Sequence, residues 1–296
     1  MKIVAITGAG GLVATNLIGL LAQSSDDYYL YAISTHVERI RDIYNGCSNV
    51  ECLDLEQFAG KSGKHVDIVL HCAFARTEDG KQIAASLQYT KALLSVSKEK
   101  GIERFVYISS QSVYDDRVPS PRGEKSPVAP KSIYALGKYA GEMLVETALL
   151  DTPIKYTSIR LASVSINARF LRIFVKNAME GIPIMVMGGK QKCSFIDVRD
   201  VALALKKVID MHHDIELQPI YNLGINNQRD IFSLAGDVKK IVEEKYGKEV
   251  EVIQQPSDLF LDAGMDSTLF FNSFNWQPQY DYDDMIIALI ESNTNN

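Results

Sequence analysis

A glycine-rich segment directly after a short apolar run constrains this chain most strongly. Residues 2–7 are mostly β-branched and apolar, as expected of a parallel strand covered on both faces. Residues 7–14 read Thr-Gly-Ala-Gly-Gly-Leu-Val-Ala, and the apolar residues of positions 12–22 recur at helical spacing. A strand, a glycine turn and a helix within about twenty residues are typical of the phosphate-binding turn of a dinucleotide-binding fold.

The small residues of this turn have separate expected roles. Gly8 permits the tight turn, Gly10 or Gly11 lets backbone N–H groups approach a pyrophosphate, and Ala14 lets helix and strand pack closely. The segment fits Gly-x-x-Gly-x-x-Ala but not Gly-x-Gly-x-x-Gly. With Leu12 at the helix N-terminus, where the backbone dipole is positive, we predict that this turn binds a cofactor.

Strands and helices continue to alternate after this turn. We expect strands at residues 28–33, 49–53, 67–72, 104–109 and 155–161, with helices at residues 37–44, 82–100 and 132–150. Later helices are expected at residues 170–180, 201–211, 231–246 and 283–292, with strands at residues 184–187 and 249–253 and an apolar segment at 194–198. The fold class is therefore α/β, a Rossmann-type doubly wound parallel sheet with a smaller C-terminal substrate-binding region.

The change in pattern after residue 160 divides the chain. Residues 1–162 are expected to form an NAD(P)-binding Rossmann domain. Residues 163–193 and 225–296 are expected to form the smaller substrate-binding region.

Composition excludes several classes of protein. The formal net charge is −6, and Lys and Arg are scattered among acids, so we expect no nucleic-acid partner. No apolar run reaches the roughly 20 residues needed to span a bilayer, and the first apolar run is too short for a signal peptide, which predicts a cytoplasmic protein without a membrane partner. The four cysteines form no metal-binding or disulfide pattern, so we expect reduced thiols and no metal.

The end of the second strand bears on the choice between NAD and NADP. An NAD-specific site usually has Asp or Glu there, to bind the ribose 2′-hydroxyl. This chain has Ser34, His36 and Arg39 in that region, which could accept a 2′-phosphate and favour NADP(H), although His36 and Arg39 could also simply face solvent. Asp54, followed by Leu55 after the third strand, could hold the adenine amino group or could cap a helix.

A tyrosine and a lysine at helical spacing indicate acid–base chemistry. Tyr134 and Lys138 lie four residues apart on one face of a predicted helix, where an ammonium would stabilise a phenolate and lower its pKa. This spacing alone arises readily by chance. Upstream, however, a predicted strand runs into Ser109-Ser-Gln-Ser at its carboxyl end, the edge at which open parallel sheets bind ligands. A serine there could donate a hydrogen bond to a substrate oxygen.

Together these segments resemble the extended short-chain dehydrogenase/reductases, in particular the NAD-dependent epimerase/dehydratase family that acts on nucleotide sugars. The resemblance covers nearly the whole chain. It implies that residues 194–224 return to the Rossmann domain, so that no linear cut of the chain separates the two regions. Its motifs are the glycine turn, Leu70-His-Cys-Ala-Phe74, Ser109-Ser-Gln-Ser-Val-Tyr114, the Tyr134 and Lys138 pair, Ser194-Phe-Ile-Asp-Val-Arg-Asp-Val201, Tyr221-Asn-Leu-Gly224 and Asn275-Trp-Gln-Pro278.

The resemblance implies roles for individual residues. Ser110 would orient the substrate oxygen, Tyr134 would exchange its proton, and Lys138 would hold the nicotinamide ribose while hydride is transferred. Further residues that would line the cofactor are Cys72, Ala73, Phe74, Ser109 and Leu161. Family members commonly dimerise through the helices expected at residues 82–100 and 132–150, so a homodimer is implied.

Departures from the family pattern narrow the expected reaction. Family dehydratases follow the catalytic Ser or Thr with an Asp-Glu pair, and this chain has Gln111 and Ser112 there, so we expect no dehydration. Many sugar epimerases have an Asn where this chain has Ser163, although Arg169 could still reach a substrate phosphate. The substrate contacts that we expect are Arg76, Gln111, Ser163 and Arg169.

The sequence thus predicts an NAD(P)-dependent enzyme that acts on a nucleotide sugar. It would be either a 4-epimerase, which keeps its cofactor through the cycle, or a 4-keto reductase, which exchanges it. The alternative is a non-catalytic protein of the same fold that senses NAD(P). Retention of both Tyr134 and Lys138 favours the enzyme.

Overall fold

The computed structural model describes residues 1–211, 215–257 and 262–294, and it divides into two compact units. The first unit consists of Met1–Val113, Pro130–Arg160 and Val201–Tyr221. The second consists of Tyr114–Ala129, Leu161–Asp200 and Asn222–Asn296. Several segments of the chain thus contribute to each unit. The division places Tyr114–Ala129, which we expected within residues 1–162, in the second unit.

A seven-stranded sheet, most of whose residues belong to the first unit, has the strand order β11-β6-β5-β4-β1-β2-β3. The strands are β1 (Lys2–Thr7), β2 (Tyr28–Ile33), β3 (Val50–Leu53), β4 (Ile68–His71), β5 (Arg104–Ser110), β6 (Lys155–Leu161) and β11 (Ile220–Leu223). The pairings that join β3, β2, β1, β4 and β5 are parallel. Strand order reverses beside β1, where doubly wound folds bind their ligands. The predicted fold class is confirmed.

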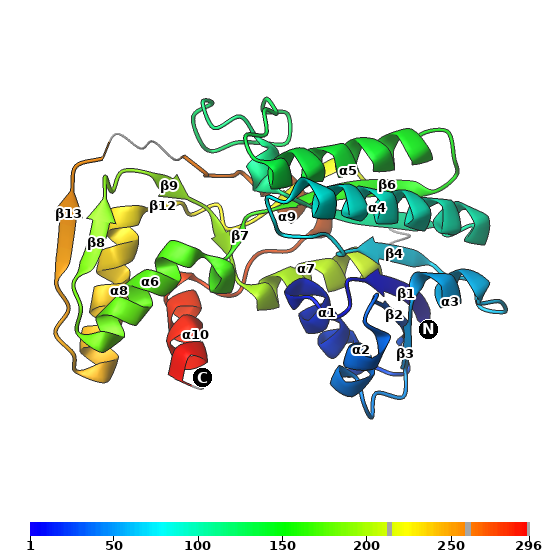
Figure 1. Ribbon diagram of the computed structural model, residues 1–296, viewed down its shortest axis with the longest axis horizontal. Coiled ribbons are helices and arrows are strands. Elements are labelled where there is room, and N and C mark those ends of the chain that lie inside the picture. The colour runs from blue at the N-terminus through cyan, green and yellow to red at the C-terminus, as the bar shows by residue number, and fades with distance from the viewer. Residues whose placement is uncertain (212–214, 258–261, 295–296) are drawn as a thin grey trace. The chain divides into compact units, whose positions relative to one another are not determined.

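Helices cover both faces of this sheet. They are α1 (Leu12–Ala22), α2 (Val37–Ile43), α3 (Leu55–Gly60), α4 (Gly80–Lys100), α5 (Ile133–Leu149) and α7 (Val198–Asp210). Helices α4 and α5 pack together on one face, and α1 and α7 lie on the other (Figure 1). The strands between them are largely buried: every residue of β4 and all but the last residue of β5 are buried. This explains why their sequences are continuously apolar rather than alternating.

Among its described residues, the second unit has its own apolar core and three small sheets. Its helices are α6 (Arg169–Glu180), α8 (Ile231–Tyr246), α9 (Thr268–Phe274) and α10 (Tyr282–Thr294), and its strands are β7 (Ser163–Val164), β8 (Ile184–Met187), β9 (Lys192–Cys193), β10 (Phe195–Ile196), β12 (Arg229–Asp230) and β13 (Val252–Gln255). Short 3₁₀ turns occur at Gln111–Val113 in the first unit and at Ser165–Asn167 in the second. Side chains of α6, α8, α10 and β8 form the core of this second unit.

Two helices were not predicted, and a third begins earlier than expected. Helices α3 and α9 have six and seven residues, too short to show a clear helical period. Helix α7 begins at Val198, three residues before the predicted start, because the apolar segment 194–198 forms only the two-residue strand β10. No helix in the described ranges is long and apolar enough to cross a membrane.

Close packing between α5 and the sheet depends on a glycine. A Cβ atom on Gly141 would lie 2.2 Å from Oη of Tyr107 on β5, a phenol that is fully buried. Glycine at this position therefore lets α5 approach β5 closely enough for Tyr107 to lie between them. Because Tyr134 and Lys138 are on the same helix, this contact also sets their height above the sheet.

Gly141→Ala is expected to destabilise the protein by about 1–3 kcal/mol, because the added methyl group overpacks the contact with Tyr107. Urea unfolding would measure the change. Gly19→Ala is the matched control: Gly19 lies in α1, and a Cβ there would have nothing within 4 Å, so alanine should stabilise by about 0.5–1 kcal/mol through helix propensity. Equal effects of the two substitutions would contradict the packing argument.

Candidate active site

The glycine turn contacts the loop that follows β4. Gly8 has a φ of +68°, and a Cβ there would lie 2.8 Å from the backbone nitrogen of Ala73, so only glycine fits. Gly10 differs, because its Cβ would meet Ile40 at 3.5 Å, an ordinary contact. The chain itself therefore does not require glycine at position 10. Helix α1 begins at Leu12 without a side-chain cap, which leaves its first N–H groups available to an anion.

A buried network of hydrogen bonds links this turn to β4 and α4. Thr7 Oγ1 lies 2.7 Å from His71 Nδ1 and accepts a hydrogen bond from the backbone N–H of Ala73. His71 Nε2 lies 2.8 Å from Thr90 Oγ1, which donates to the carbonyl of Ser86. Thr90 must therefore accept from Nε2–H, and Nδ1 must accept from Thr7. Burial lowers the pKa of His71 to about 3, with a smaller contribution from the Lys138 charge, so the imidazole is neutral.

The predicted ribose-binding residues lie around a pocket after β2. The pocket is lined by Thr35, His36, Val37, Glu38 and Arg39. The hydroxyl oxygen of Ser34 accepts the backbone N–H of His36 at 3.1 Å, which shapes this turn. One carboxylate, that of Glu38, also lines the pocket, and it forms an ion pair with Arg41. Glu38 lies five residues beyond the end of β2, outside the position at which a ribose-binding carboxylate is expected from sequence.

Asp54 caps a helix. Its carboxylate accepts the backbone N–H of Gln57 at 2.7 Å, and the Gln57 side chain accepts the N–H of Asp54 at 3.0 Å, which together make a capping box at the start of α3. Leu55 is the first residue of this helix. Of the two roles considered for Asp54, the structure shows the cap, and adenine binding by Asp54 and Leu55 stays a prediction.

Tyr134 and Ser110 come together through a hydrogen bond between their side chains. Burial raises the pKa of Tyr134 above 10, while the charge of Arg76 and the hydrogen bond with Ser110 oppose that rise. We had expected Lys138 to lower this pKa. In the structure the cation that does so is Arg76, an exposed residue in the loop after β4, and the net pKa shift is upward.

Lys138 lies among aromatic rings below Tyr134. Its side chain is buried, and Nζ donates a hydrogen bond of 2.7 Å to the carbonyl of Ile108 on β5. Nζ lies 4.4 Å from the ring centre of Phe74 and 5.9 Å from that of Tyr134. Desolvation lowers the pKa of Lys138 to about 7, against smaller opposing contributions from Cys72 and Glu142. Burial raises the pKa of Cys72 to about 12, so this residue is a neutral thiol.

Two polar residues that sequence analysis did not assign to the site also contact it. Glu78 accepts the backbone N–H of Ile133 at 2.7 Å and that of Tyr134 at 3.5 Å, which ties the Arg76 loop to the start of α5. Ser112 donates to Ser110 Oγ at 2.9 Å from its hydroxyl. Gln111 is half-buried at the start of the 3₁₀ turn. Neither Glu78 nor Ser112 belongs to a sequence motif from which these hydrogen bonds could have been predicted.

Three predicted residues belong to the second unit. Leu161 is buried at the end of β6, Ser163 is exposed on β7, and Arg169 is exposed at the start of α6. The remaining predicted residues all lie in the first unit.

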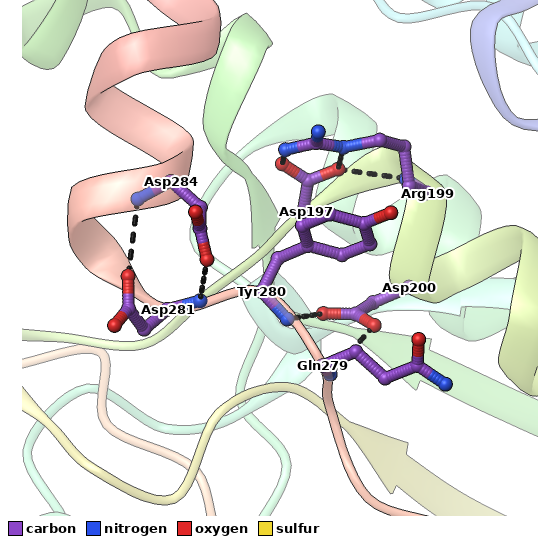
Figure 2. A network of polar contacts seen from close by, with 7 residues as sticks. All are labelled: Asp197, Arg199, Asp200, Gln279, Tyr280, Asp281 and Asp284. Atoms are coloured by element: carbon purple, nitrogen blue, oxygen red, sulfur yellow. Dashed lines mark hydrogen bonds and ion pairs between the residues drawn. The ribbon is translucent and has the colours of Figure 1, made fainter.

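The motif at residues 194–201 has a structural role in the second unit (Figure 2). Asp197 binds Arg199 through two side-chain hydrogen bonds of 2.8 Å, and the guanidinium stacks 3.7 Å from the ring centre of Tyr280. The Asp200 carboxylate accepts the backbone N–H groups of Gln279 and Tyr280 at 2.9 and 3.0 Å. This network fixes the start of α7 to the segment before α10.

One group of side chains in the described ranges could offer three ligand atoms to a metal. His65, Asp67 and Glu103 place such atoms within 4.8 Å of one another. Asp67 already accepts the backbone N–H of Ile3 at 2.6 Å, and His65 Nε2 lies 3.4 Å from a carboxylate oxygen of Glu103. These residues lie just before the amino ends of β4 and β5, whereas Ser110 lies at the carboxyl end of β5. They are therefore not part of the candidate active site.

Comparison with known families agrees with this arrangement. The profile of the NAD dependent epimerase/dehydratase family matches residues 4–224, which include the glycine turn, Ser110, Tyr134 and Lys138. The chain belongs to this family. The resemblance noted in the sequence is thus confirmed.

Relatives of this epimerase/dehydratase family member include a trifunctional UDP-glucose 4,6-dehydratase/UDP-4-keto-6-deoxy-D-glucose 3,5-epimerase/UDP-4-keto-L-rhamnose-reductase of Arabidopsis thaliana. The two are 26% identical over 274 residues, which is 81% of this chain but only 40% of the plant protein. The dTDP-D-glucose 4,6-dehydratase of Mus musculus is 23% identical over 82% of this chain and 74% of the mouse protein.

Solved structures share the fold over the whole chain. The UDP-glucuronic acid 4-epimerase from Bacillus cereus, in complex with UDP-glucuronic acid and NAD, has a TM-score of 0.80 at 20% identity and covers 99% of both chains. A dTDP-glucose 4,6-dehydratase from Bacillus anthracis, in complex with NAD, has a TM-score of 0.79 at 18% identity and covers 100% of this chain and 97% of the other. Both epimerases and dehydratases thus share this architecture.

Lys138→Met is expected to change how stability depends on pH. Because the pKa of Lys138 is about 7 in the folded chain and 10.5 ordinarily, the unfolded chain binds the extra proton between these values. Lys138 therefore makes the free energy of unfolding rise with pH above 7, by up to about 1.4 kcal/mol per pH unit. Methionine removes this dependence, and the gain in stability is largest below pH 7.

Urea unfolding at several pH values between 6 and about 9 would measure this effect, which follows from the lowered lysine pKa. Lys98→Met, at an exposed position on α4, is the control and should leave the pH dependence as in the unmodified protein. Parallel pH profiles for the Lys138→Met variant and the unmodified protein would refute a lowered pKa for Lys138.

Proposed function

We propose that this protein is an NAD(P)-dependent enzyme that acts on a nucleotide sugar, as a 4-epimerase or a 4-keto reductase. The observation that carries the proposal is the arrangement of Ser110, Tyr134 and Lys138 at the carboxyl end of β5. The Tyr134 hydroxyl is hydrogen-bonded to Ser110, and the buried Lys138 lies one helical turn away. Titratable groups with shifted pKa values that cluster in this way are typical of catalytic sites.

The residues of the first unit fit a dinucleotide. Packing within the chain does not require glycine at position 10, because a Cβ there would make only an ordinary contact. Its lack of a side chain would instead let a pyrophosphate approach the N-terminus of α1. Lys138 would hold the nicotinamide ribose. When bound, the cofactor supplies the group that accepts or donates hydride.

In this proposal Tyr134 exchanges a proton with the substrate. Its Oη would take the proton of a substrate hydroxyl on oxidation and return one on reduction. Ser110 accepts hydrogen bonds from the N–H and hydroxyl of Ser112, at 3.2 and 2.9 Å, so its own proton is free to be donated to Tyr134 or to a substrate oxygen. The phenol form of Tyr134, which predominates near pH 7, is the proton donor for reduction. The positive charge of Arg76 opposes the rise in the Tyr134 pKa and so favours the phenolate that oxidation requires.

The residues after Ser110 favour epimerisation or reduction over dehydration. Elimination of water requires an acid and a base placed beside the sugar, and family dehydratases use an Asp-Glu pair for this. Gln111 and Ser112 carry no carboxylate at those positions. The relatives and solved structures include dehydratases, so the reaction class must be established by product analysis.

The pocket after β2 supports acceptance of NADP(H). Glu38 is the carboxylate there, and its ion pair with Arg41 balances its charge. His36 and Arg39 line the same pocket and would meet a 2′-phosphate. NAD(H) stays the alternative, since a carboxylate at this place can also bind a ribose hydroxyl.

Tyr134→Phe should abolish hydride transfer, with a loss of at least about 100-fold in kcat, because phenylalanine has no proton to exchange. Cofactor affinity should remain nearly unchanged. Turnover would be followed with nucleotide sugars selected by a thermal-shift screen in the presence of NAD⁺ or NADPH.

Tyr156→Phe, on β6, is the control and should retain full turnover. Unchanged turnover in Tyr134→Phe would refute the catalytic assignment. If the unmodified protein binds cofactor tightly but converts no nucleotide sugar, the protein is a sensor instead. Tightly retained NAD⁺ would support an epimerase, and a requirement for added NADPH would support a reductase.

We also propose that the protein forms a homodimer through α4 and α5. An open groove on these helices is lined by Leu87, Gln88, Lys91, Leu136, Tyr139, Ala140, Met143, Leu144 and Thr147, and its accessible surface is almost wholly apolar. Leu136 is 57% exposed and Met143 is 37% exposed, and both lie in this one apolar groove rather than singly on the surface. A second copy could cover this face by a two-fold contact of the same helices.

Leu136→Glu should shift the protein to the monomer by placing a charge in the apolar contact. Light scattering coupled to size-exclusion chromatography would measure the mass of each variant. Leu150→Glu is the control, because Leu150 is 64% exposed at the end of α5 but does not line the groove. A monomeric unmodified protein, or equal masses for it and Leu136→Glu, would refute the dimer.

A further inference from the structure

A buried ion pair joins α5 to the two strands beneath it. Glu142 on α5 accepts hydrogen bonds from Arg160 on β6, Nε to Oε1 at 2.9 Å and Nη2 to Oε2 at 2.7 Å. The side chains are only 1% and 4% exposed. The hydroxyl of Ser109 on β5 also donates to Oε1 at 2.5 Å. One carboxylate therefore fixes α5, β5 and β6 to one another.

This ion pair lies next to the candidate catalytic residues along α5. Tyr134, Lys138 and Glu142 are spaced by four residues, so they follow one another along one face of α5. Ser109, which Glu142 holds, directly precedes Ser110 at the end of β5. The distance between the Ser110 and Tyr134 hydroxyls is thus controlled by the elements that Glu142 joins.

Other ionisable groups surround Lys138, but most are neutral near pH 7. Cys72 is a thiol, because burial raises its pKa to about 12, and His71 is neutral, because burial lowers its pKa to about 3. Burial also raises the pKa values of Tyr107 and Tyr134, so both are uncharged phenols. Glu142 is therefore the negative charge that acts on Lys138 at this pH, and Arg160 holds it in place.

Retention of such a pair requires an explanation. Two buried charges lose their hydration, and apolar residues of similar volume often stabilise a core as well or better. A buried pair that joins three elements next to reacting groups can instead be retained because it aligns those groups and stabilises the charge of one of them. This reasoning rests on the function proposed above.

We propose that Glu142, clamped by Arg160 and Ser109, is a positioning residue that aligns Ser110 with Tyr134 and keeps the Lys138 ammonium charged. Glu142 touches neither substrate nor cofactor in this role. It acts through the lysine, by its charge, and through the end of β5, by its hydrogen bonds.

Glu142→Gln tests the charge while leaving a side chain of the same shape. We expect the titration midpoint of Lys138 to move down by about one pH unit. It would be followed by NMR of the lysine side chains, with the Lys138 signal assigned by its loss in Lys138→Met. Because this titration needs neither substrate nor turnover, it tests the inference separately from the reaction. In the active enzyme the alkaline limb of the kcat profile should move down by a similar amount.

Two further variants make the result decisive. Glu146→Gln removes a carboxylate one helical turn further along α5 and should leave the Lys138 titration unchanged. Glu142→Gln/Arg160→Gln removes both charges, so neither is left buried without a partner, and it is used if the single variant fails to fold. A downward shift in either Glu142 variant, absent from Glu146→Gln, supports the proposal. An unshifted Lys138 midpoint in a folded Glu142 variant, or an equal shift in Glu146→Gln, overturns it.

Discussion

Burial of the Lys138 ammonium is the constraint on which the candidate site depends. An ammonium removed from water requires compensating partners, and here these are the Ile108 carbonyl, the faces of Phe74 and Tyr107, and the charge of Glu142. Those partners come from β5, the loop after β4 and α5. The position of one charge thus requires close packing of all three.

Glycine makes that packing possible at two places. Gly8 brings the turn after β1 against Ala73, and Gly141 lets α5 settle onto Tyr107. The hydrogen-bond network of Thr7 and His71 then holds the ends of β1 and β4 in register, with every hydrogen bond assigned to a donor and an acceptor. Because both ring nitrogens of His71 are engaged in buried hydrogen bonds, this histidine has a structural role.

Sequence patterns predicted the fold class because its signals are local. The glycine turn, the apolar strands and the spacing of Tyr134 and Lys138 are each visible within a few residues. Contacts between distant segments are not. The effect of Arg76 on the Tyr134 pKa, the capping of α5 by Glu78 and the pairing of Glu142 with Arg160 all depend on which elements are neighbours in space. Helices α3 and α9 were missed because they are too short to show a period.

The sheet also sets an order of events during synthesis. Strand β6 ends at Leu161, but its outer neighbour β11 begins only at Ile220. On the ribosome β6 would therefore remain an uncovered sheet edge while about sixty further residues are made, at a stage when exposed strand edges favour association with other chains. A chaperone that shields strand edges would therefore have its greatest effect on nascent chains that end before Ile220.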